Sequence, residues 1–378
     1  MLRTVLAALA ALCLSAGLVA AQSQGTPARS ALVVDITSGA VLLEKDATRA
    51  LPPASMSKLM TLNMVFEALD QGLISMNDKF RISKRASQMG GSKMFIREGE
   101  LVSIQDLVRG VIVQSGNDAA VALAEALAGT EEAFAERMNQ RAVDLGLLNS
   151  SFANATGWPD PRQLMSARDL VTLTTRLIQE FPQYYPMFAE TTFTWDGIEQ
   201  KNRNPLLTLG VGADGLKTGH TEEAGYGLAA SAVRGKRRIV MVITGLSSKS
   251  ERRHEAERLI NWAFRAFETR QLYAAGEGLI EAPVWIGSSA SVTLAPERDI
   301  TVTAPFGALD KASLKVRYAG PVPAPISEGQ QIGHVVISVP DLEPVKVPLV
   351  ATHTVERGGF LTRVQAAGKL LVLNVLPD

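Results

Sequence analysis

The stretch Pro52-Pro53-Ala54-Ser55-Met56-Ser57-Lys58 opens a long apolar run that continues to Leu69. If this run is a helix, the Ser55 hydroxyl and the Lys58 amine lie on one face, because residues three apart are neighbours there. Apolar surroundings disfavour the ammonium form of lysine, so Lys58 could act as a neutral base for the Ser55 nucleophile. Alone, the S-x-x-K pattern is weak, because an ordinary polar helix start gives it too.

A second fragment, Ser115-Gly116-Asn117, lies between two apolar segments that we expect to be helices, Ile104–Val113 and Asp118–Ala128. Ser103 and Asp106 form a plausible capping pair for the first of them. By itself, Ser-Gly-Asn between helices is most often a turn.

A third fragment, Lys217-Thr218-Gly219-His220-Thr221, precedes a predicted β-hairpin whose strands are Tyr226–Val233 and Arg238–Gly245. On a strand, Lys-Thr-Gly is unremarkable. In this order, however, S-x-x-K, S-x-N and K-T-G form the signature of the serine β-lactamases and penicillin-binding proteins.

The surroundings of the three motifs narrow the resemblance to the D-alanyl-D-alanine carboxypeptidases, the low-molecular-mass penicillin-binding proteins. The segment Phe152–Gly157 also resembles that family, and the similarity runs from about Ala31 to the C-terminus. The residues that carry it are Ala54–Thr61, Gln114–Ala120 and Asp214–Thr221.

The resemblance implies a peptidoglycan stem peptide ending in D-Ala-D-Ala as substrate and β-lactam antibiotics as inhibitors. Ser55 would attack the penultimate D-Ala carbonyl, and water would hydrolyse the acyl-enzyme. Lys58 would be the base, Ser115 would relay a proton to the leaving amine, and Asn117 would hold the substrate amide or Lys58. Lys217 would keep the site positive.

The same resemblance assigns substrate binding to Thr218, Gly219, His220 and Arg252. Thr218 would hold the terminal carboxylate, and the backbone N–H groups of Ser55 and His220 would form the oxyanion hole. Arg252 would pair with the substrate carboxylate, for which a guanidinium fork is suited, although the adjacent Arg253 stays an alternative.

The implied fold class is α+β. It comprises a catalytic domain like that of the serine β-lactamases and penicillin-binding proteins, an antiparallel sheet flanked by helices, followed by a small all-β sandwich. We expect a signal peptide at 1–21, the catalytic domain at 22–274, the sandwich at 275–357 and a tail at 358–378. The sheet would combine a first hairpin, Ala31–Asp35 and Gly39–Leu43, with the late strands, among which Thr191–Trp195 also reads as a strand.

Further helices are predicted at 131–145, capped by Thr130, at 167–180, capped by Ser166, and at 251–267. After Arg270 the composition becomes rich in Val, Ile, Thr and Pro, in short alternating runs that are typical of a β-sandwich. The strands expected there are 291–294, 300–304, 314–318, 334–339 and 345–351.

The N-terminus has the pattern of a secretory signal, with Arg3 before an apolar region at 5–19 and small residues before Gln22. We therefore expect export to the periplasm. The only cysteine, Cys13, lies inside this signal, so the mature chain would contain no disulfide. The tail segment 360–376 could form an amphipathic helix on the inner-membrane surface, or a packed strand or helix.

The balance of 38 basic and 38 acidic side chains gives no argument for binding nucleic acid. The four histidines are scattered and no metal-ligand set is visible, so neither a metal nor a cofactor is predicted.

Three other functions stay open. A β-lactamase would need a carboxylate that activates the deacylating water, and Glu136 with Asn139 has superficially suitable spacing, although it reads as a solvated helix face. A D,D-endopeptidase would cut cross-links with the same motifs. A catalytically idle envelope protein would bind peptidoglycan or division partners without reaction.

Overall fold

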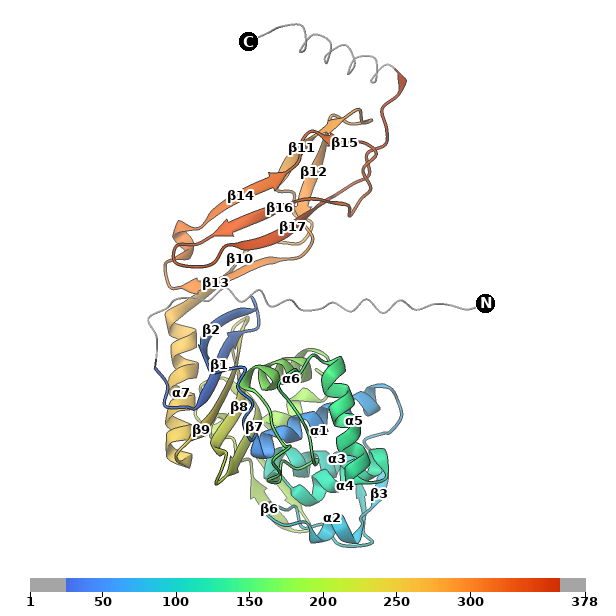
Figure 1. The fold of residues 1–378 in the computed structure, drawn as a ribbon, viewed down its shortest axis with the longest axis vertical. Coiled ribbons are helices and arrows are strands. Elements are labelled where there is room, and N and C mark those ends of the chain that lie inside the picture. The colour runs from blue at the N-terminus through green and yellow to red at the C-terminus, as the bar shows by residue number, and fades with distance from the viewer. Residues whose placement is uncertain (1–24, 361–378) are drawn as a thin grey trace, which may run out of the picture. The chain divides into compact units, whose positions relative to one another are not determined.

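The computed structural model describes residues 25–360, which divide into two compact units after Glu268 (Figure 1). The predicted signal peptide, residues 1–21, and most of the predicted tail, 361–378, lie outside the described residues. The predicted boundary after residue 274 stays a prediction; it falls just beyond the strand β10 (Phe267–Tyr273).

The first unit is built on a five-stranded sheet in the order β2-β1-β9-β8-β7. The first hairpin pairs with the last strand of the unit in antiparallel register, for example Leu32 with Val242. The expectation that the first hairpin and the late strands join one sheet is therefore confirmed for these five. Their bounds are β1 (Ser30–Asp35), β2 (Ala40–Lys45), β7 (Ala213–Thr221), β8 (Gly225–Arg234) and β9 (Arg237–Leu246).

The strand predicted at Thr191–Trp195 exists as β5 (Thr192–Trp195), but it does not belong to this sheet. Within the described part of the chain it pairs with β6 (Ile198–Lys201) alone, in a separate two-stranded hairpin. Sequence alternation identified the strand, whereas the choice of partner depends on the two-residue turn that follows it. A second small sheet joins β3 (Lys79–Arg81) and β4 (Leu101–Ser103).

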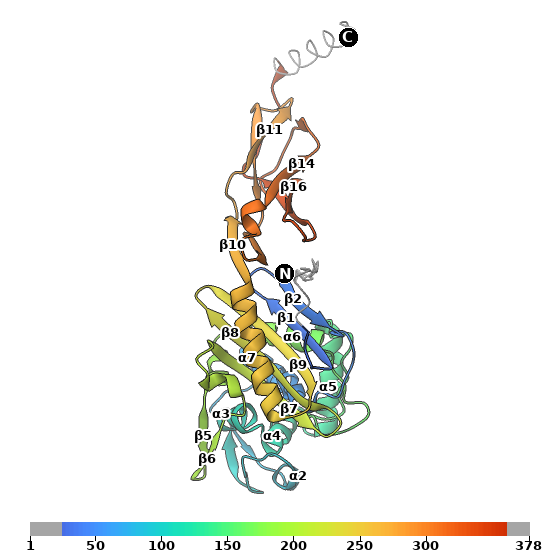
Figure 2. The same cartoon turned by 90° about the vertical axis from the view of Figure 1, so that its left-hand side faces the viewer.

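Helices cover both faces of the main sheet. α7 (Lys249–Ala266) packs on one face against β8 and β9, and α6 (Ala167–Gln179) packs on the other (Figure 2). α1 (Lys58–Asp70) lies inside the helical layer with both its apolar and several of its polar side chains buried, in contact with α4, α5 and α6. The remaining helices of this layer are α2 (Lys84–Gln88), α3 (Ile104–Arg109), α4 (Asn117–Ala128) and α5 (Glu131–Asp144).

The caps predicted at Thr130 and Ser166 are confirmed. The Thr130 hydroxyl accepts a hydrogen bond from Ala133 N, and the Ser166 hydroxyl accepts one from Asp169 N. Such bonds satisfy backbone donors that the first helical turn leaves free. Ser103 likewise accepts from Asp106 N at the start of α3.

Two predicted helices differ from the structure at their functional ends. The segment 104–113 is α-helical only to Arg109, and Gly110–Gln114 widens into a π-helical turn. Ser55 lies not in α1 but in the preceding 3-10 turn, Ala54–Ser57. Both irregular turns contain or adjoin a motif serine, Ser55 or Ser115. A regular helix there would give the serine side chain a different direction.

The second unit contains only strands and one short 3-10 turn between Thr269 and Ala351. A six-stranded sheet in the order β14-β16-β17-β12-β11-β15 and the pair β10-β13 share one apolar core. All five predicted strands are present, whereas β10, β11 and β15 were not predicted. The strands are β11 (Ile280–Trp285), β12 (Ser291–Pro296), β13 (Ile300–Pro305), β14 (Ser313–Tyr318), β15 (Val322–Pro323), β16 (Gln331–Ser338) and β17 (Val345–Ala351).

No helix between residues 25 and 360 has the length and apolar character needed to cross a membrane.

Candidate active site

The three motifs meet at the edge strand of the main sheet. The turn Ala54–Ser57 packs directly on β7, at Gly219. A Cβ at Gly219 would lie 2.7 Å from the Pro53 carbonyl oxygen, so any larger residue would push the nucleophile turn away from the strand. The glycine of the third motif therefore brings the first motif into contact with β7.

Lys58 connects the nucleophile to the second motif. Its Nζ lies 2.9 Å from Ser55 Oγ, 2.7 Å from Asn117 Oδ1 and 2.5 Å from the Thr156 carbonyl oxygen. A neutral amine can donate its two hydrogens to Asn117 and Thr156 and accept the hydrogen of the Ser55 hydroxyl. The three contacts therefore suit a general base acting on Ser55.

The electrostatics of Lys58 agree with this geometry. The side chain is 0% exposed, and burial lowers the pKa of Lys58 to about 7. Arg203 lowers this pKa further, whereas Asp118 and Glu131 oppose the shift. A lysine with this pKa holds a substantial neutral fraction near neutral pH, as a base needs.

Lys217 lies beside it on β7 and is also buried. Burial first, and then the charges of Lys58, Arg203 and Arg252, hold the pKa of Lys217 well below its usual range. Among residues 25–360, the one acceptor within hydrogen-bond distance of its Nζ is the Thr218 carbonyl oxygen, at 3.3 Å. Lys217 would therefore keep the site positive only with an anion bound, because the negative charge of the anion would raise the pKa of Lys217 again.

Ser115 ends the π-helical turn in the left-handed region, with φ 63° and ψ 34°. Its Oγ is buried, and no described residue forms a hydrogen bond with it. The next motif residue is fixed by a neighbouring loop, since Asn117 N donates to Ser92 O and Asn117 Nδ2 donates to Gly90 O. Asn117 is thus held rigidly, while the Ser115 hydroxyl is left available to a ligand.

The structure distinguishes Arg252 from Arg253, the two candidate partners of the substrate carboxylate. Arg252 is buried, and its guanidinium lies 5.8 Å from the Tyr226 ring centroid, whereas Arg253 is exposed. Tyr226 also stacks on His220, with ring centroids 3.9 Å apart. Burial lowers the pKa of Arg252, and its Nε has no hydrogen-bond partner among the described residues.

Sequence reasoning missed three groups that shape this site. Arg203, in the loop after β6, donates to Ser92 Oγ and is a source of positive potential for both lysines. Asp118 accepts backbone N–H bonds from Met94 at 3.0 Å and Phe95 at 2.9 Å. The Thr156 carbonyl belongs to a segment noticed in the sequence, but only the structure shows its contact with Lys58.

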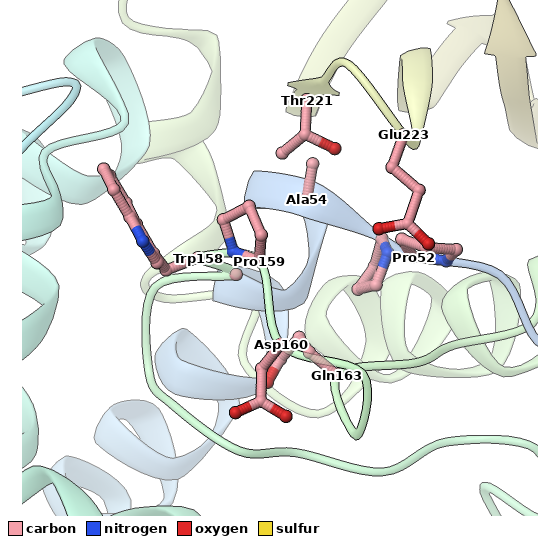
Figure 3. Close-up of a pocket in the computed structure, with 10 residues that line it drawn as sticks. Pro52, Ala54, Trp158, Pro159, Asp160, Gln163, Thr221 and Glu223 are labelled. Carbon is pink, nitrogen blue, oxygen red and sulfur yellow. The ribbon is translucent and has the colours of Figure 1, made fainter.

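A shallow depression adjoins the nucleophile turn (Figure 3). It lies between that turn, the loop that follows Gly157, and the end of β7. Its lining residues are Pro52, Pro53, Ala54, Gly157, Trp158, Pro159, Asp160, Gln163, Thr221 and Glu223.

Two family models match the sequence and follow the order of the two units. Residues 18–248 match the family model described as D-alanyl-D-alanine carboxypeptidase, a peptidase family. The chain belongs to the D-alanyl-D-alanine carboxypeptidase family. Residues 267–357 match the C-terminal domain of penicillin-binding protein 5, in agreement with the predicted all-β second unit.

Individual members of the carboxypeptidase family are similar over nearly the whole chain. The D-alanyl-D-alanine carboxypeptidase DacC of Escherichia coli K12 is 37% identical over 353 residues, which cover 91% of this chain and 88% of that protein. DacF of Bacillus subtilis is 33% identical, covering 89% of this chain and 87% of the relative.

Solved structures of the carboxypeptidase family are also similar to this chain. Penicillin-binding protein 5 from Haemophilus influenzae superimposes with a TM-score of 0.83 at 36% identity, over 88% of this chain and 98% of that one. Penicillin-binding protein D2 from Listeria monocytogenes, solved with ampicillin bound, covers 64% of this chain and 98% of its own, with a TM-score of 0.58 at 31% identity. The predicted fold class is thereby confirmed.

The carboxylate considered for a β-lactamase does not fit that role. Glu136 is exposed on α5, while Asn139 turns inward and donates to the Phe152 carbonyl oxygen. Glu131, on the same helix, lies nearer the site. Its carboxylate accepts a hydrogen bond from Ala155 N and forms an ion pair with Arg85. Glu131 therefore supports the loop rather than standing free to activate water.

No group of three or more histidine, cysteine or acidic side chains within residues 25–360 is arranged to hold a metal ion.

Proposed function

We propose that this protein is a serine D-alanyl-D-alanine carboxypeptidase that removes the terminal D-Ala from peptidoglycan pentapeptides and is inhibited by penicillin. The observation that carries this function is the contact of Ser55 Oγ with the buried amine of Lys58, whose pKa is lowered to about 7. Membership of the carboxypeptidase family supports the same reaction.

Acylation begins when Ser55 Oγ attacks the carbonyl carbon of the penultimate D-Ala and its proton moves to Lys58 Nζ. The carbonyl π electrons move to the oxygen, which the backbone N–H groups of Ser55 and His220 stabilise. When the C–N bond breaks, the leaving amine must gain a proton. The free Ser115 hydroxyl is suited to pass that proton from Lys58, and D-Ala departs.

Deacylation repeats these steps with water as the nucleophile. Water loses a proton to the same base, its oxygen bonds to the ester carbon, and Ser55 leaves with a proton restored. One peptide bond and one water are consumed, and one free D-Ala and one shortened peptide are formed.

The terminal carboxylate of the substrate belongs, in this proposal, near Thr218, Lys217 and Arg252. These groups supply a hydroxyl, an amine and a guanidinium whose Nε lacks a partner among the described residues. A bound carboxylate would raise the pKa of Lys217 and so keep its ammonium charged. Arg252, being buried beside Tyr226, is the better of the two candidate arginines.

Purified protein incubated with pentapeptide and with cross-linked muropeptides tests the reaction. We expect release of D-Ala from the pentapeptide to dominate. Release of monomers from cross-linked material as the main reaction would indicate an endopeptidase, whereas rapid turnover of penicillin would indicate a β-lactamase. Failure to be labelled by fluorescent penicillin would indicate an idle binding protein.

We also propose that the chain is exported through the signal at 1–21 and acts in the periplasm, with the tail 358–378 against the inner-membrane surface. Fractionation of cells that express the full chain and a chain ending at residue 357 tests the tail. Equal amounts of both in the soluble periplasmic fraction would contradict membrane contact.

A further inference from the structure

Two loops without helical or strand structure hold the partners of the Lys58 amine. The segment 154–158 supplies the Thr156 carbonyl oxygen, which accepts from Lys58 Nζ at 2.5 Å. The segment 90–92 holds Asn117, whose Oδ1 accepts from the same Nζ at 2.7 Å. Because neither loop belongs to a regular element, its position depends on the side chains that contact it.

Trp158 joins these two loops. Its backbone belongs to the first loop, since Trp158 N donates to Asn154 Oδ1 at 3.1 Å and Asn154 Nδ2 donates to the Trp158 carbonyl oxygen at 3.0 Å. Its indole ring reaches the second loop. A Cβ placed on Gly90 would lie 3.3 Å from Cη2 of the ring, and one placed on Gly91 would lie 3.0 Å from Cζ3. Figure 3 shows the ring extending away from Glu223.

Gly91 lies against both the indole and the Asn117 amide. The Cβ position on Gly91 that meets the ring would also lie 2.8 Å from Asn117 Nδ2. The same amide nitrogen donates to the Gly90 carbonyl oxygen at 2.8 Å, and Asn117 N donates to the Ser92 carbonyl oxygen at 2.7 Å. The indole, the glycine segment and the amide therefore form one packed group, and a side chain at Gly91 would separate them.

We propose that Trp158 is a positioning residue for the Lys58 base. Its indole presses the glycine segment onto the Asn117 amide, which keeps Asn117 Oδ1 on Lys58 Nζ and keeps water away from the amine. Trp158 is 45% exposed, so packing in a hydrophobic core does not account for so large a side chain at this position. The inference rests on the proposed function, because it concerns how the base of that reaction is held.

This role connects Trp158 to the protonation of Lys58. Loss of the indole would free the glycine segment and admit water to the amine. Burial is the main cause that lowers the pKa of Lys58, so access of water should raise this pKa toward its ordinary value. A change at Trp158 leaves the neighbouring charges in place. These charges belong to Arg203 after β6, Lys217 on β7, Asp118 on α4 and Glu131 on α5.

The test measures the second-order rate constant of penicillin acylation across pH, which reports the protonation of the free enzyme. Near neutral pH, Trp158→Ala should lower this constant about 10- to 100-fold, as small misplacements of reacting groups do. It should also move the acid limb of the profile to higher pH. Trp158→Phe keeps an aromatic ring over the glycine segment and should restore most of the rate and the position of the limb.

Trp262→Ala is the matched control. Trp262 is a partly exposed tryptophan on α7, and its ring packs edge-on against Phe267 with centroids 5.1 Å apart. The control should leave the acid limb where it is in the wild type.

Three results would overturn the positioning role. The first is acylation of Trp158→Ala at the wild-type rate. The second is an equal fall at every pH, since this would make the indole a contact of the ligand rather than a support of the base. The third is the same movement of the acid limb in Trp262→Ala, which would indicate a general loosening of the first unit.

Failure of the proposed function gives a different result. If the wild-type protein releases no D-Ala from pentapeptide, the carboxypeptidase proposal fails. If the wild type releases D-Ala and Trp158→Ala has an unchanged pH profile, only the role of Trp158 fails.

Discussion

Gly157 lies so close to Ala54 that a Cβ on this glycine would be 1.9 Å from the Ala54 carbonyl oxygen. The contact joins the loop that supplies the Thr156 carbonyl to the turn that carries Ser55. The loop is further held by Asn154, whose Oδ1 accepts from Thr156 N and Gly157 N. Lys58 and Ser55 are therefore oriented from two sides.

Gly157→Ala should disturb this contact and reduce both stability and penicillin acylation. Gly146→Ala is a matched control, since both glycines have positive φ, 79° and 69°, but nothing lies within 4 Å of a Cβ at Gly146. A left-handed alanine alone costs about 1–2 kcal/mol. Thermal unfolding should show a larger loss for Gly157→Ala, and equal losses would contradict the close contact.

Ser55→Ala should abolish labelling by fluorescent penicillin without unfolding the protein. The Ser55 side chain forms no helix-cap hydrogen bond, so the change in stability should be below about 1 kcal/mol. Ser57→Ala, which removes the bond from Ser57 Oγ to the Ala54 carbonyl, is the control and should keep labelling. A penicillin adduct found by mass spectrometry on Ser57 or Ser115 would refute the assignment.

The acylation rate should fall as the pH drops through about 7, because Lys58 with this pKa becomes an ammonium that cannot accept the Ser55 proton. Once the carboxylate of bound penicillin has raised the pKa of Lys217, loss of the Lys217 proton should give a falling limb at higher pH, and the two limbs report the coupled pair rather than either lysine alone. Lys58→Arg should be inactive at every pH, since arginine keeps its proton. Substantial acylation by this variant would exclude Lys58 as the base.

Arg203→Gln should move the acid limb of that profile to higher pH. Arg203 lowers the pKa of Lys58, so removing its charge raises the pKa and demands a higher pH for the neutral amine. Arg203→Lys retains the charge, so its acid limb should lie at the same pH as in the wild type. This variant separates the effect of the charge from the loss of the hydrogen bond to Ser92. The exposed Arg253→Gln is the control, and an unmoved limb in Arg203→Gln would show that its charge does not act on Lys58.

A fragment of residues 22–274 should still bind penicillin and release D-Ala from a soluble peptide. It retains Phe267, which is buried in the first unit and whose carbonyl oxygen accepts from Arg237 Nη1. Circular dichroism measures whether the fragment is folded, and penicillin labelling measures whether it still binds penicillin. An unfolded fragment, under conditions where the full chain works, would show that the first unit depends on the second.

The sequence predicted most reliably the elements whose signals are local. α5 and α6 have capping hydroxyls and long amphipathic faces, and β8 and β9 are joined by a short turn, so their bounds were close to those observed. β11 and β15 were missed because each contains a proline and exposed positions, so neither shows a clear alternation. The partner of β5 depended on a two-residue turn that the pattern did not resolve.

The sequence predicted the motifs that form the candidate site, but not the contacts between residues that are far apart in the chain. Lys58 and Asn117 are 59 residues apart, and Lys58 and Thr156 are 98 apart, so no spacing rule reveals their contact. The residues were selected by resemblance to a family, and their catalytic roles remain predictions. Arg203 had no signal at all, since a single arginine in a loop is ordinary until the fold brings it near two lysines.

The backbone at Ser115 implies that this site is maintained at the expense of the fold's own stability. Left-handed conformations of residues other than glycine cost about 1 kcal/mol or more, and Ser115 adopts one at the end of a π-helical turn. Selection for thermal resistance alone would thus favour glycine at this position, at the loss of the hydroxyl. Ser115→Gly should therefore unfold at a higher temperature than the wild type, while it loses the hydroxyl that the proposed mechanism uses.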